Sequence, residues 1–277
     1  MNDYERAGDL VLVEDSELVI SRPSSLPANH DVAAIVEEVL REHPLPFPLK
    51  DFQKHALYEL GNLNNVILTS PTDSGKMLVA YLAIRVLKKR FGKPSGVGLG
   101  TQPLSAIMNE KLKSKYIRTG TISMTGSLQV NSESDLEEED VSLSAPIDDF
   151  KTGKIDCIFG HAESWVTEIA KTILDELQED ELIVFTFLDE AHIPLFNHWN
   201  TFRPHMKLVP GQLRGRTVRK APCLAMTATL IPTEVNELMK VMGFREENTA
   251  VIKSNPVQDH HKFIRLVIFS LFSFFAD

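Results

Sequence analysis

The 277-residue chain has little cysteine, and none of it in a cluster. Its two cysteines, Cys157 and Cys223, stand far apart, and neither has a second cysteine at metal-ligand spacing. This spacing excludes a cysteine-based zinc site and fits a protein of a reducing compartment. We therefore expect both thiols to lie in the core.

Positive charge and long apolar runs are also scarce. The chain has 29 Lys and Arg against 38 Asp and Glu, a formal net charge of −9. This balance argues against a general basic coat for nucleic acid, although it leaves room for a local basic groove. The acidic N-terminus has no apolar stretch, which excludes a secretory signal. The apolar run 263–277 is short for a bilayer span and contains Arg265, so we expect no membrane contact.

The pattern along the chain is strand, loop and helix, repeated. Short apolar runs that favour buried strands lie at 66–70, 97–101, 157–160, 182–188 and 223–229. Helical spacing follows several of them, at 77–90, 104–116 and 233–244. Such alternation predicts an α/β fold, a mostly parallel sheet with helices on both faces.

Three sections of the chain differ in character. Residues 1–28 are expected to form a weakly structured leader with a strand candidate at 10–13, and 29–255 the main domain. Two helices are expected before the first buried strand, at 31–42 and from Asp51, which we take as an N-cap. The acidic stretch 131–149 favours an exposed loop over a functional acidic contact. Residues 256–277 form the third section.

The first chemical motif runs from Ser70 to Met77, with the sequence S-P-T-D-S-G-K-M. It follows a strand and opens a helix, which is where backbone N–H groups and a helix N-terminus surround phosphate while a lysine neutralises it. Taken alone, the motif is equally compatible with an ordinary turn before a helix, because the strict pattern has Gly at Ser70 and Ser or Thr at Met77.

The second motif, Asp189-Glu190-Ala191-His192, directly follows the run 182–188. An acid pair at the carboxyl end of a buried strand lies where open α/β sheets bind ligands. The first acid can hold Mg²⁺ and the second can orient attacking water. The alternative is a helix N-terminus that carries two acids. The order of the two motifs favours the nucleotide site.

Over about residues 45–260 the chain resembles the superfamily-two helicases. P-T-x-S-G-K at 71–76 is similar to their motif I, D-E-A-H at 189–192 to motif II, and Thr227-Ala228-Thr229 to motif III. Gln53 stands where the superfamily has an adenine-reading glutamine. The resemblance implies a RecA-like P-loop NTPase fold.

Three features narrow the resemblance to the RecQ type. P-L-S-A-I-M at 103–108 is similar to RecQ motif Ia, and L-A-M-T-A-T-L at 224–230 to its motif III. The segment F-N-H-W-N-T-F-R-P at 196–204 resembles the aromatic-rich loop, which senses single-stranded DNA in that family. Trp199, Phe202 and Arg203 would stack bases and pair with phosphates, although core packing is an alternative for the two aromatic residues.

The resemblance implies a role for each matching residue. Lys76 would bind phosphate, Asp189 would hold Mg²⁺ and Glu190 would activate water. The nucleotide-binding set is Phe47 and Gln53 for adenine, and Thr72, Asp73, Ser74, Gly75, Lys76 and Met77 for the phosphates. His192, Thr227, Ala228 and Thr229 would couple hydrolysis to strand movement. ATP and Mg²⁺ would be the cofactors, and single-stranded or forked DNA the partner, with 3′–5′ polarity and a nuclear location in a eukaryote.

Departures from the pattern predict a weakened site. Asp73 replaces a glycine that accepts positive φ and lets backbone approach phosphate, and its charge repels polyphosphate. Met77 replaces a hydroxyl ligand of Mg²⁺ with a soft thioether. Ile193 stands where the family often has cysteine, and the aromatic-rich loop is one residue short.

Beyond motif III the resemblance reaches only a segment like the linker toward a second RecA-like lobe. We expect 256–277 to be a truncated part of that linker, and little unwinding by one lobe alone. Two other interpretations stay open: a non-catalytic module that binds DNA or a partner through a decayed phosphate loop, and an RNA helicase of the D-E-A-H class. The basic stretch 214–220 could add electrostatic attraction for DNA, but a solvated loop is favoured.

Overall fold

The computed structural model describes residues 10–12, 19–21, 30–101, 117–124, 141–143, 145–195 and 204–254. Its strands are β1 Leu10–Leu12, β2 Val19–Ser21, β3 Asn65–Thr69, β4 Val97–Thr101, β5 Thr119–Met124, β6 Val141–Leu143, β7 Cys157–Gly160, β8 Ile183–Leu188, β9 Cys223–Thr227 and β10 Thr249–Lys253. Its α-helices are α1 His30–Glu42, α2 Asp51–Gly61, α3 Lys76–Phe91, α5 Ile147–Lys151, α6 Ala162–Trp165, α7 Glu168–Glu179, α9 Val209–Arg214 and α10 Val235–Met242. Short 3₁₀ turns are η2 Ile193–Leu195, η3 Pro204–Lys207, η4 Pro232–Glu234 and η5 Glu246–Asn248.

The strands of the described residues form one sheet in the order β1-β2-β10-β3-β9-β8-β4-β7-β5-β6. Every pairing from β10 to β5 in this order is parallel, whereas β1, β2 and β6 pair antiparallel at the two sides. The loops that follow β3, β8 and β9 therefore leave the sheet at one edge, the carboxyl edge. The predicted mostly parallel α/β sheet is confirmed.

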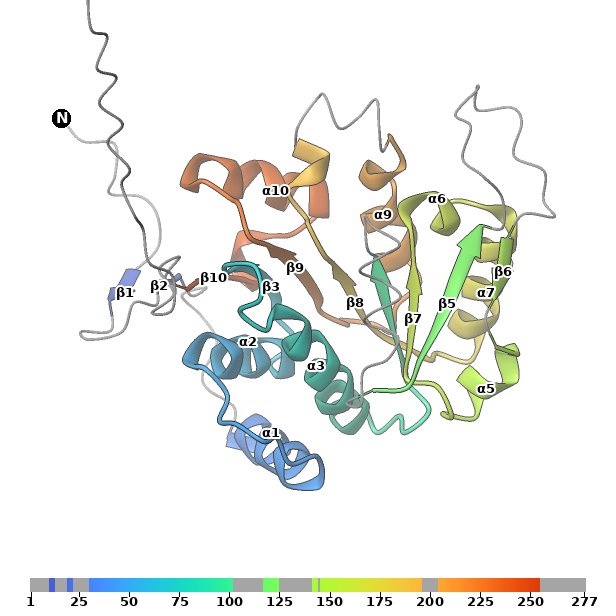
Figure 1. Cartoon of the computed structure of the whole chain (residues 1–277), viewed down its shortest axis with the longest axis horizontal. Helices are drawn as coiled ribbons and strands as arrows, with labels where there is room; N and C mark the ends of the chain where they lie inside the picture. Colours follow the sequence, from blue (N-terminus) through green and yellow to red (C-terminus); the bar gives the residue numbers. More distant parts are fainter. Residues whose placement is uncertain are drawn as a thin grey trace, which may run out of the picture.

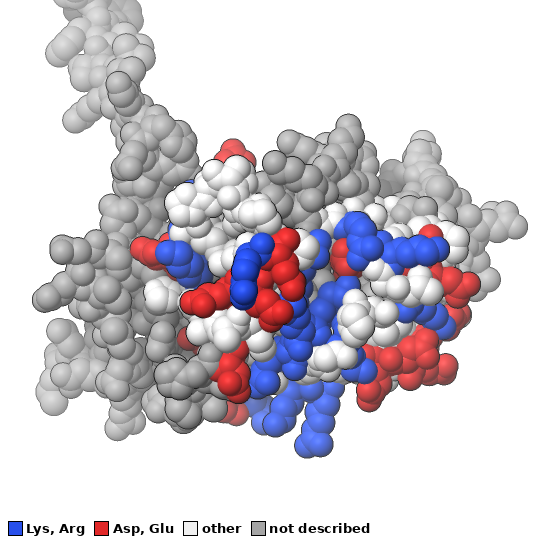
Figure 2. All heavy atoms as spheres, turned by 90° about the horizontal axis from the view of Figure 1, so that it is seen from below, with Lys and Arg blue, Asp and Glu red and all other residues white. Residues whose placement is uncertain are grey.

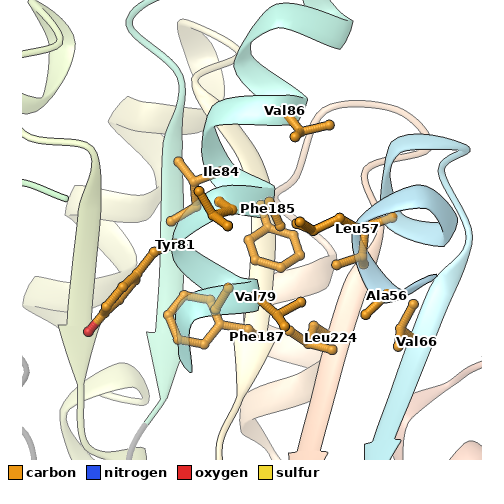
Figure 3. Packing of buried hydrophobic residues seen from close by; sticks show 14 of the residues in the cluster. Ala56, Leu57, Val66, Val79, Tyr81, Ile84, Val86, Phe185, Phe187 and Leu224 are labelled. Carbon is orange, nitrogen blue, oxygen red and sulfur yellow. The ribbon is translucent and has the colours of Figure 1, made fainter. Parts of the chain in front are cut away.

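Helices cover both faces of the sheet (Figure 1). One core lies beneath α1, α2 and α3, and the other beneath α7, α9 and α10. Figure 3 shows the first core, where Leu57 of α2 and Ile84 of α3 meet Phe185 and Phe187 of β8. Phe185 and Phe187 stack on each other, whereas Phe159 packs edge to face on Phe187 with 5.5 Å between the ring centroids. The central strands are apolar at successive positions because helices cover both faces of the sheet.

Glycine in β4 shows how closely this core packs. A Cβ added at Gly100 would lie 2.3 Å from Cζ of Phe187. A side chain there would force the aromatic ring to move, because real Cβ contacts are never so short. Gly100 therefore makes room for the ring of Phe187 on the neighbouring strand β8.

Several element boundaries differ from the sequence-based expectations. Asp51 is the first residue of α2 and not its N-cap, which is Lys50. The stretch 131–149 is not one loop, because β6 and the start of α5 lie within it. The strand predicted at 223–229 ends at Thr227. The expected leader contributes β1, as predicted, and also β2, so it extends the sheet.

Two further expectations concern the cysteines and the membrane. Cys157 and Cys223 are both buried and unbridged, as predicted. None of the helices in the described part of the chain is long and apolar enough to cross a bilayer. The expected helix at 104–116, the acidic residues 131–140 and the segments 1–9 and 256–277 lie outside the described residues.

Candidate functional site

The phosphate-loop motif joins the end of β3 to the start of α3, as predicted. Asp73 has φ of 60° and Gly75 has φ of 93°, both in the left-handed region. A Cβ at Gly75 would lie 2.6 Å from Nε2 of Gln53, so both conformation and space require glycine there. Asp73 occupies a left-handed position that glycine would fill without strain, and aspartate is among the few other residues that tolerate it.

Lys76 is the first residue of α3 and points back into the loop. Its Nζ donates to the carbonyl oxygens of Ser70 and Pro71, each at 2.7 Å. These two bonds hold the ammonium group within the curve of the loop. This is where a lysine can meet phosphate oxygens, since carbonyl acceptors are readily exchanged for a stronger, charged acceptor.

The glutamine expected to contact adenine is built into the loop's support. Gln53 is buried, its Oε1 accepts from the backbone N–H of Lys50 at 2.9 Å, and its Nε2 donates to the carbonyl of Gly75 at 3.1 Å. The side chain thus fixes both the start of α2 and the phosphate loop. Phe47, the other adenine candidate, is 49% exposed just before α2, as an aromatic residue that stacks on a base would be.

The remaining loop residues divide between solvent and core. Thr72 and Asp73 are exposed, whereas Ser74 is buried. Met77 is partly buried and packs against the core beneath α3. At the position where the family has a hydroxyl ligand for Mg²⁺, this chain therefore has an apolar thioether that packs against the core.

The acids of D-E-A-H lie at the carboxyl end of β8. Asp189 is 8% exposed, its backbone N–H donates to the carbonyl of Thr101, and its Oδ1 accepts from the N–H of Glu190 at 3.2 Å. Glu190 has φ of 53°, a left-handed conformation that a glutamate rarely adopts. Backbone strain of this kind concentrates at functional sites, so it favours the predicted role over an ordinary helix start.

The two motifs are not on adjacent strands, because β9 lies between β3 and β8. A phosphate loop and an acid pair at one edge would suggest neighbouring strands, but here the two strands are separated by β9, and both end at the same edge. Local sequence patterns do not encode strand order, which depends on how the whole sheet packs. The intervening strand carries motif III and connects the two sites.

Thr227 makes that connection through both backbone and side chain. Its carbonyl accepts from the N–H of Ser70 at 3.1 Å, and its Oγ1 lies 2.8 Å from Nδ1 of His192. The same oxygen accepts from the N–H of Thr229 at 3.1 Å. Nδ1 of His192 is also 3.3 Å from the carboxylate of Glu190. One threonine thus contacts both the phosphate loop and D-E-A-H.

The His192 ring is half-buried, and burial lowers its pKa below the ordinary value, against the opposing effect of Glu234 and Asp189. The ring is therefore neutral at physiological pH. The tautomer with hydrogen on Nδ1 donates toward Thr227 Oγ1 and Glu190, and the threonine hydroxyl then donates to the carbonyl of Thr229. Ala228 lies within this turn and is half-buried.

Sequence reasoning missed Tyr81 of α3. Burial and the negative charges of Cys157 and Asp189 raise the pKa of its phenol, and its hydroxyl is buried with no hydrogen-bond partner among the described residues. The electrostatic effect of Asp189 indicates that α3, which begins at Lys76, passes close to the acid. A tyrosine within an apolar helix gives no local signal of this placement.

The predicted DNA-binding residues Trp199, Phe202 and Arg203, and the motif Ia stretch at 103–108, lie outside the described residues. Of the basic stretch 214–220, Arg214 donates to the carbonyls of Met242 and Gly243 and Arg216 pairs with Asp175 at 2.8 Å. These two arginines therefore support the fold. Arg219 and Lys220 are exposed.

The face opposite the carboxyl edge shows a band of Lys and Arg between two groups of acids (Figure 2). Among the described residues, several lysines pair with acids, for example Lys89 with Glu38 at 3.0 Å and Lys93 with Glu181 at 2.9 Å. The protein itself therefore supplies acidic partners for these lysines. Within the described ranges, the structure holds no group of three or more His, Cys, Asp or Glu side chains that could bind a metal ion.

Known proteins similar to this chain are helicases. "Probable helicase HelY" of Mycobacterium leprae is 34% identical over 93 residues, which are 32% of this chain and 10% of that protein. "Antiviral helicase SKI2" of Saccharomyces cerevisiae is 32% identical over 89 residues, 31% of this chain and 7% of that protein. The chain thus spans a small part of the curated relatives it matches.

Among solved structures, the DUF1998 helicase MrfA aligns with a TM-score of 0.47 and 15% identity, over 82% of this chain and 33% of that one. A hypothetical ATP-dependent RNA helicase from Sulfolobus tokodaii aligns with a TM-score of 0.48 and 14% identity, over 80% and 57%. The family profile described as DEAD/DEAH box helicase matches residues 50–238, the section that holds the phosphate loop, D-E-A-H and Thr227 to Thr229. The chain belongs to the DEAD/DEAH box helicase family.

Proposed function

We propose that this domain is the ATP-binding lobe of a nucleic-acid-dependent ATPase of superfamily two. The observation that carries the proposal is the position of Thr227, which contacts Ser70 of the phosphate loop and His192 of D-E-A-H. A β9 residue that contacts both motifs at the carboxyl edge provides a direct physical route between nucleotide chemistry and the rest of the domain.

The residues present fit the phosphates of a nucleotide better than they fit its metal ion. The left-handed loop, the N-terminus of α3 and Lys76 provide backbone donors and one positive charge. Asp189 offers a carboxylate for Mg²⁺, but Met77 offers no oxygen. Bound Mg–ATP would supply the transferable phosphoryl group and its countercharge. We expect weak metal-dependent binding.

Each residue at this edge has a chemical task in the proposal. Lys76 neutralises phosphate charge after it exchanges its carbonyl acceptors, and Asp189 holds the metal. Glu190 orients water, and His192 keeps its carboxylate in place from 3.3 Å. Gln53 supports the loop from below, and the exposed Phe47 stacks on the base.

Mutation of the loop and of the acid pair separates catalysis from mere binding. Lys76→Ala should abolish nucleotide binding, measured by titration calorimetry. Glu190→Gln should keep binding but lose phosphate release, by about a hundredfold or more for loss of general base catalysis. If the wild-type protein binds ATP and releases no phosphate, with or without nucleic acid, the non-catalytic interpretation replaces this one.

The nucleic-acid partner follows from the resemblance to RecQ helicases, which favours single-stranded or forked DNA and 3′–5′ polarity. The relatives that match include HelY and SKI2, whose names specify no RecQ type, and the D-E-A-H motif makes an RNA substrate the competing candidate. ATP hydrolysis should be measured with matched single-stranded DNA and RNA of one sequence. Stronger stimulation by RNA would reject the DNA assignment.

A further inference from the structure

Three serine hydroxyls form a continuous hydrogen-bonded chain beneath the phosphate loop. Oγ of Ser254 donates to Oγ of Ser70 at 2.8 Å, and Oγ of Ser70 donates to Oγ of Ser74 at 2.6 Å. Ser70 and Ser74 are 1% and 5% exposed, so water competes little for these bonds. In such a chain each bond polarises the next, and the loss of one hydroxyl weakens its neighbour.

Ser70 links four parts of the site. Besides its hydroxyl contacts to Ser74 and Ser254, its N–H donates to Thr227, and its carbonyl accepts from Lys76 at 2.7 Å. A displacement of Ser70 therefore moves the phosphate-binding lysine and the motif III strand together. The strict phosphate-loop pattern has glycine at this position, which has no hydroxyl to form such a chain.

Ser254 lies where the chain leaves the sheet. It directly follows β10, which pairs in parallel with β3 up to the position where Lys253 faces Thr69. Its N–H donates to the carbonyl of Thr69 at 2.9 Å, so backbone and hydroxyl both hold it beside the first residues of the loop. The course of the chain after β10 is thus fixed to the phosphate loop by two bonds.

We propose that Ser254 is a positioning residue for nucleotide binding, which acts on the phosphate loop through the Ser70 hydroxyl. This inference rests on the proposed function of the loop. The Ser74 hydroxyl accepts in the chain of serines, so its own proton is the one that it can direct toward a phosphate oxygen. Since coupling is reciprocal, a bound nucleotide must in turn stabilise the backbone at Ser254.

The test is a double-mutant cycle with Ser70→Ala and Ser254→Ala, in which Mg–ATP affinity is measured by titration calorimetry. Loss of the Ser254 hydroxyl should raise Kd about threefold to tenfold, the usual effect of one hydrogen bond. The double variant should be no weaker than Ser70→Ala alone, because both changes break one chain. Ser254→Thr keeps the hydroxyl and should restore the wild-type Kd.

Thr249→Val provides the matched control at the other end of β10, where Thr249 Oγ1 donates to the carbonyl of Arg245 at 2.7 Å. It removes one hydroxyl from the same strand and should leave Kd unchanged. Hydrogen exchange at the Ser254 amide should slow when ATP is added, which a purely structural serine would not show.

Each outcome decides the proposal. If the wild-type protein binds ATP and Ser254→Ala binds it equally well, or if the two single effects multiply, the positioning role is wrong while the proposed function stands. If the wild-type protein binds no ATP or ADP, both fall together.

Discussion

The two edges of the sheet use the same residue type in opposite ways. Asp156 lies just before β7 at the amino edge, and Asp189 lies just after β8 at the carboxyl edge, and both are buried. Asp156 is enclosed by Lys88 at 2.6 Å and by Arg118, whose Nε and terminal nitrogen lie 2.9 and 2.8 Å from its oxygens. Asp189 lies beside Glu190, whose φ of 53° is in the left-handed region, and its Oδ1 accepts from the backbone N–H of Glu190.

This difference separates a structural carboxylate from a chemical one. At the amino edge the protein supplies the cations itself, which ties α3 to the strands β5 and β7. At the carboxyl edge, Lys76 donates to the carbonyl oxygens of Ser70 and Pro71, and Glu190 has a φ of 53°, which a glutamate rarely adopts. Backbone strain next to Asp189 is consistent with a functional site at this edge.

The largest expected effect comes from matched isosteric changes at the two edges. Asp156→Asn should reduce the free energy of unfolding by about 3 kcal/mol, since it leaves the nearly buried Lys88 ammonium without its charge partner. Asp189→Asn should change it by about 1 kcal/mol or less. Urea denaturation of both variants measures the contrast, and equal losses would remove the distinction between the edges.

Acid should weaken the amino edge selectively. Burial alone would raise the pKa of Asp156, but hydrogen bonds from Arg118 and Lys88 outweigh it and lower the pKa from 3.8 to about 2. A depressed folded-state pKa stabilises the protein above the unfolded value, and this contribution of about 2 kcal/mol is lost as pH falls from about 5 toward 2. The difference in unfolding free energy between the wild type and Asp156→Asn should shrink over that range. A constant difference would contradict the assignment.

At the carboxyl edge, Asp73→Gly should improve nucleotide binding and not impair folding. The change removes a charge worth about 1 kcal/mol at 4 Å in water, or about a fivefold lower Kd for ATP. Asp73→Ala is the control, because it removes the same charge but keeps a side chain at φ of 60°. It should match the gain in affinity and lose about 1 kcal/mol of stability relative to the glycine variant. If neither variant binds ATP more tightly than the wild type, Asp73 is not what weakens the site.

The smallest effect concerns the contact between motifs II and III. Thr227→Val and His192→Ala should each cost about 1 kcal/mol of stability for the lost hydrogen bond, and the double variant less than their sum. Stimulation of ATP hydrolysis by nucleic acid should fall in both single variants while ATP affinity is kept. If nucleic acid stimulates ATP hydrolysis in Thr227→Val as strongly as in the wild type, the contact between Thr227 and His192 does not couple nucleic-acid binding to hydrolysis.

The sequence by itself determined the local parts of this protein. Apolar runs bounded by polar turns predicted β4 and β7 to the residue, and the motif at 70–77 was expected to join a strand to a helix. Hydrophobic periodicity and turn chemistry depend on neighbouring residues, so they can be recognised without the fold. D-E-A-H at a strand end belongs to the same class of local signal.

Only the tertiary structure decided which of these parts meet. The place of β9 between β3 and β8 makes Thr227 the contact of both motifs, and the place of β10 beside β3 brings Ser254, 184 residues away in the chain, to Ser70. The tertiary structure also surrounds Asp156 with Lys88 and Arg118, and it places Gln53 where its side chain can donate to the carbonyl of Gly75. Strand order and side-chain pairing result from packing the whole sheet between two helical layers, which the separate segments of the sequence do not encode.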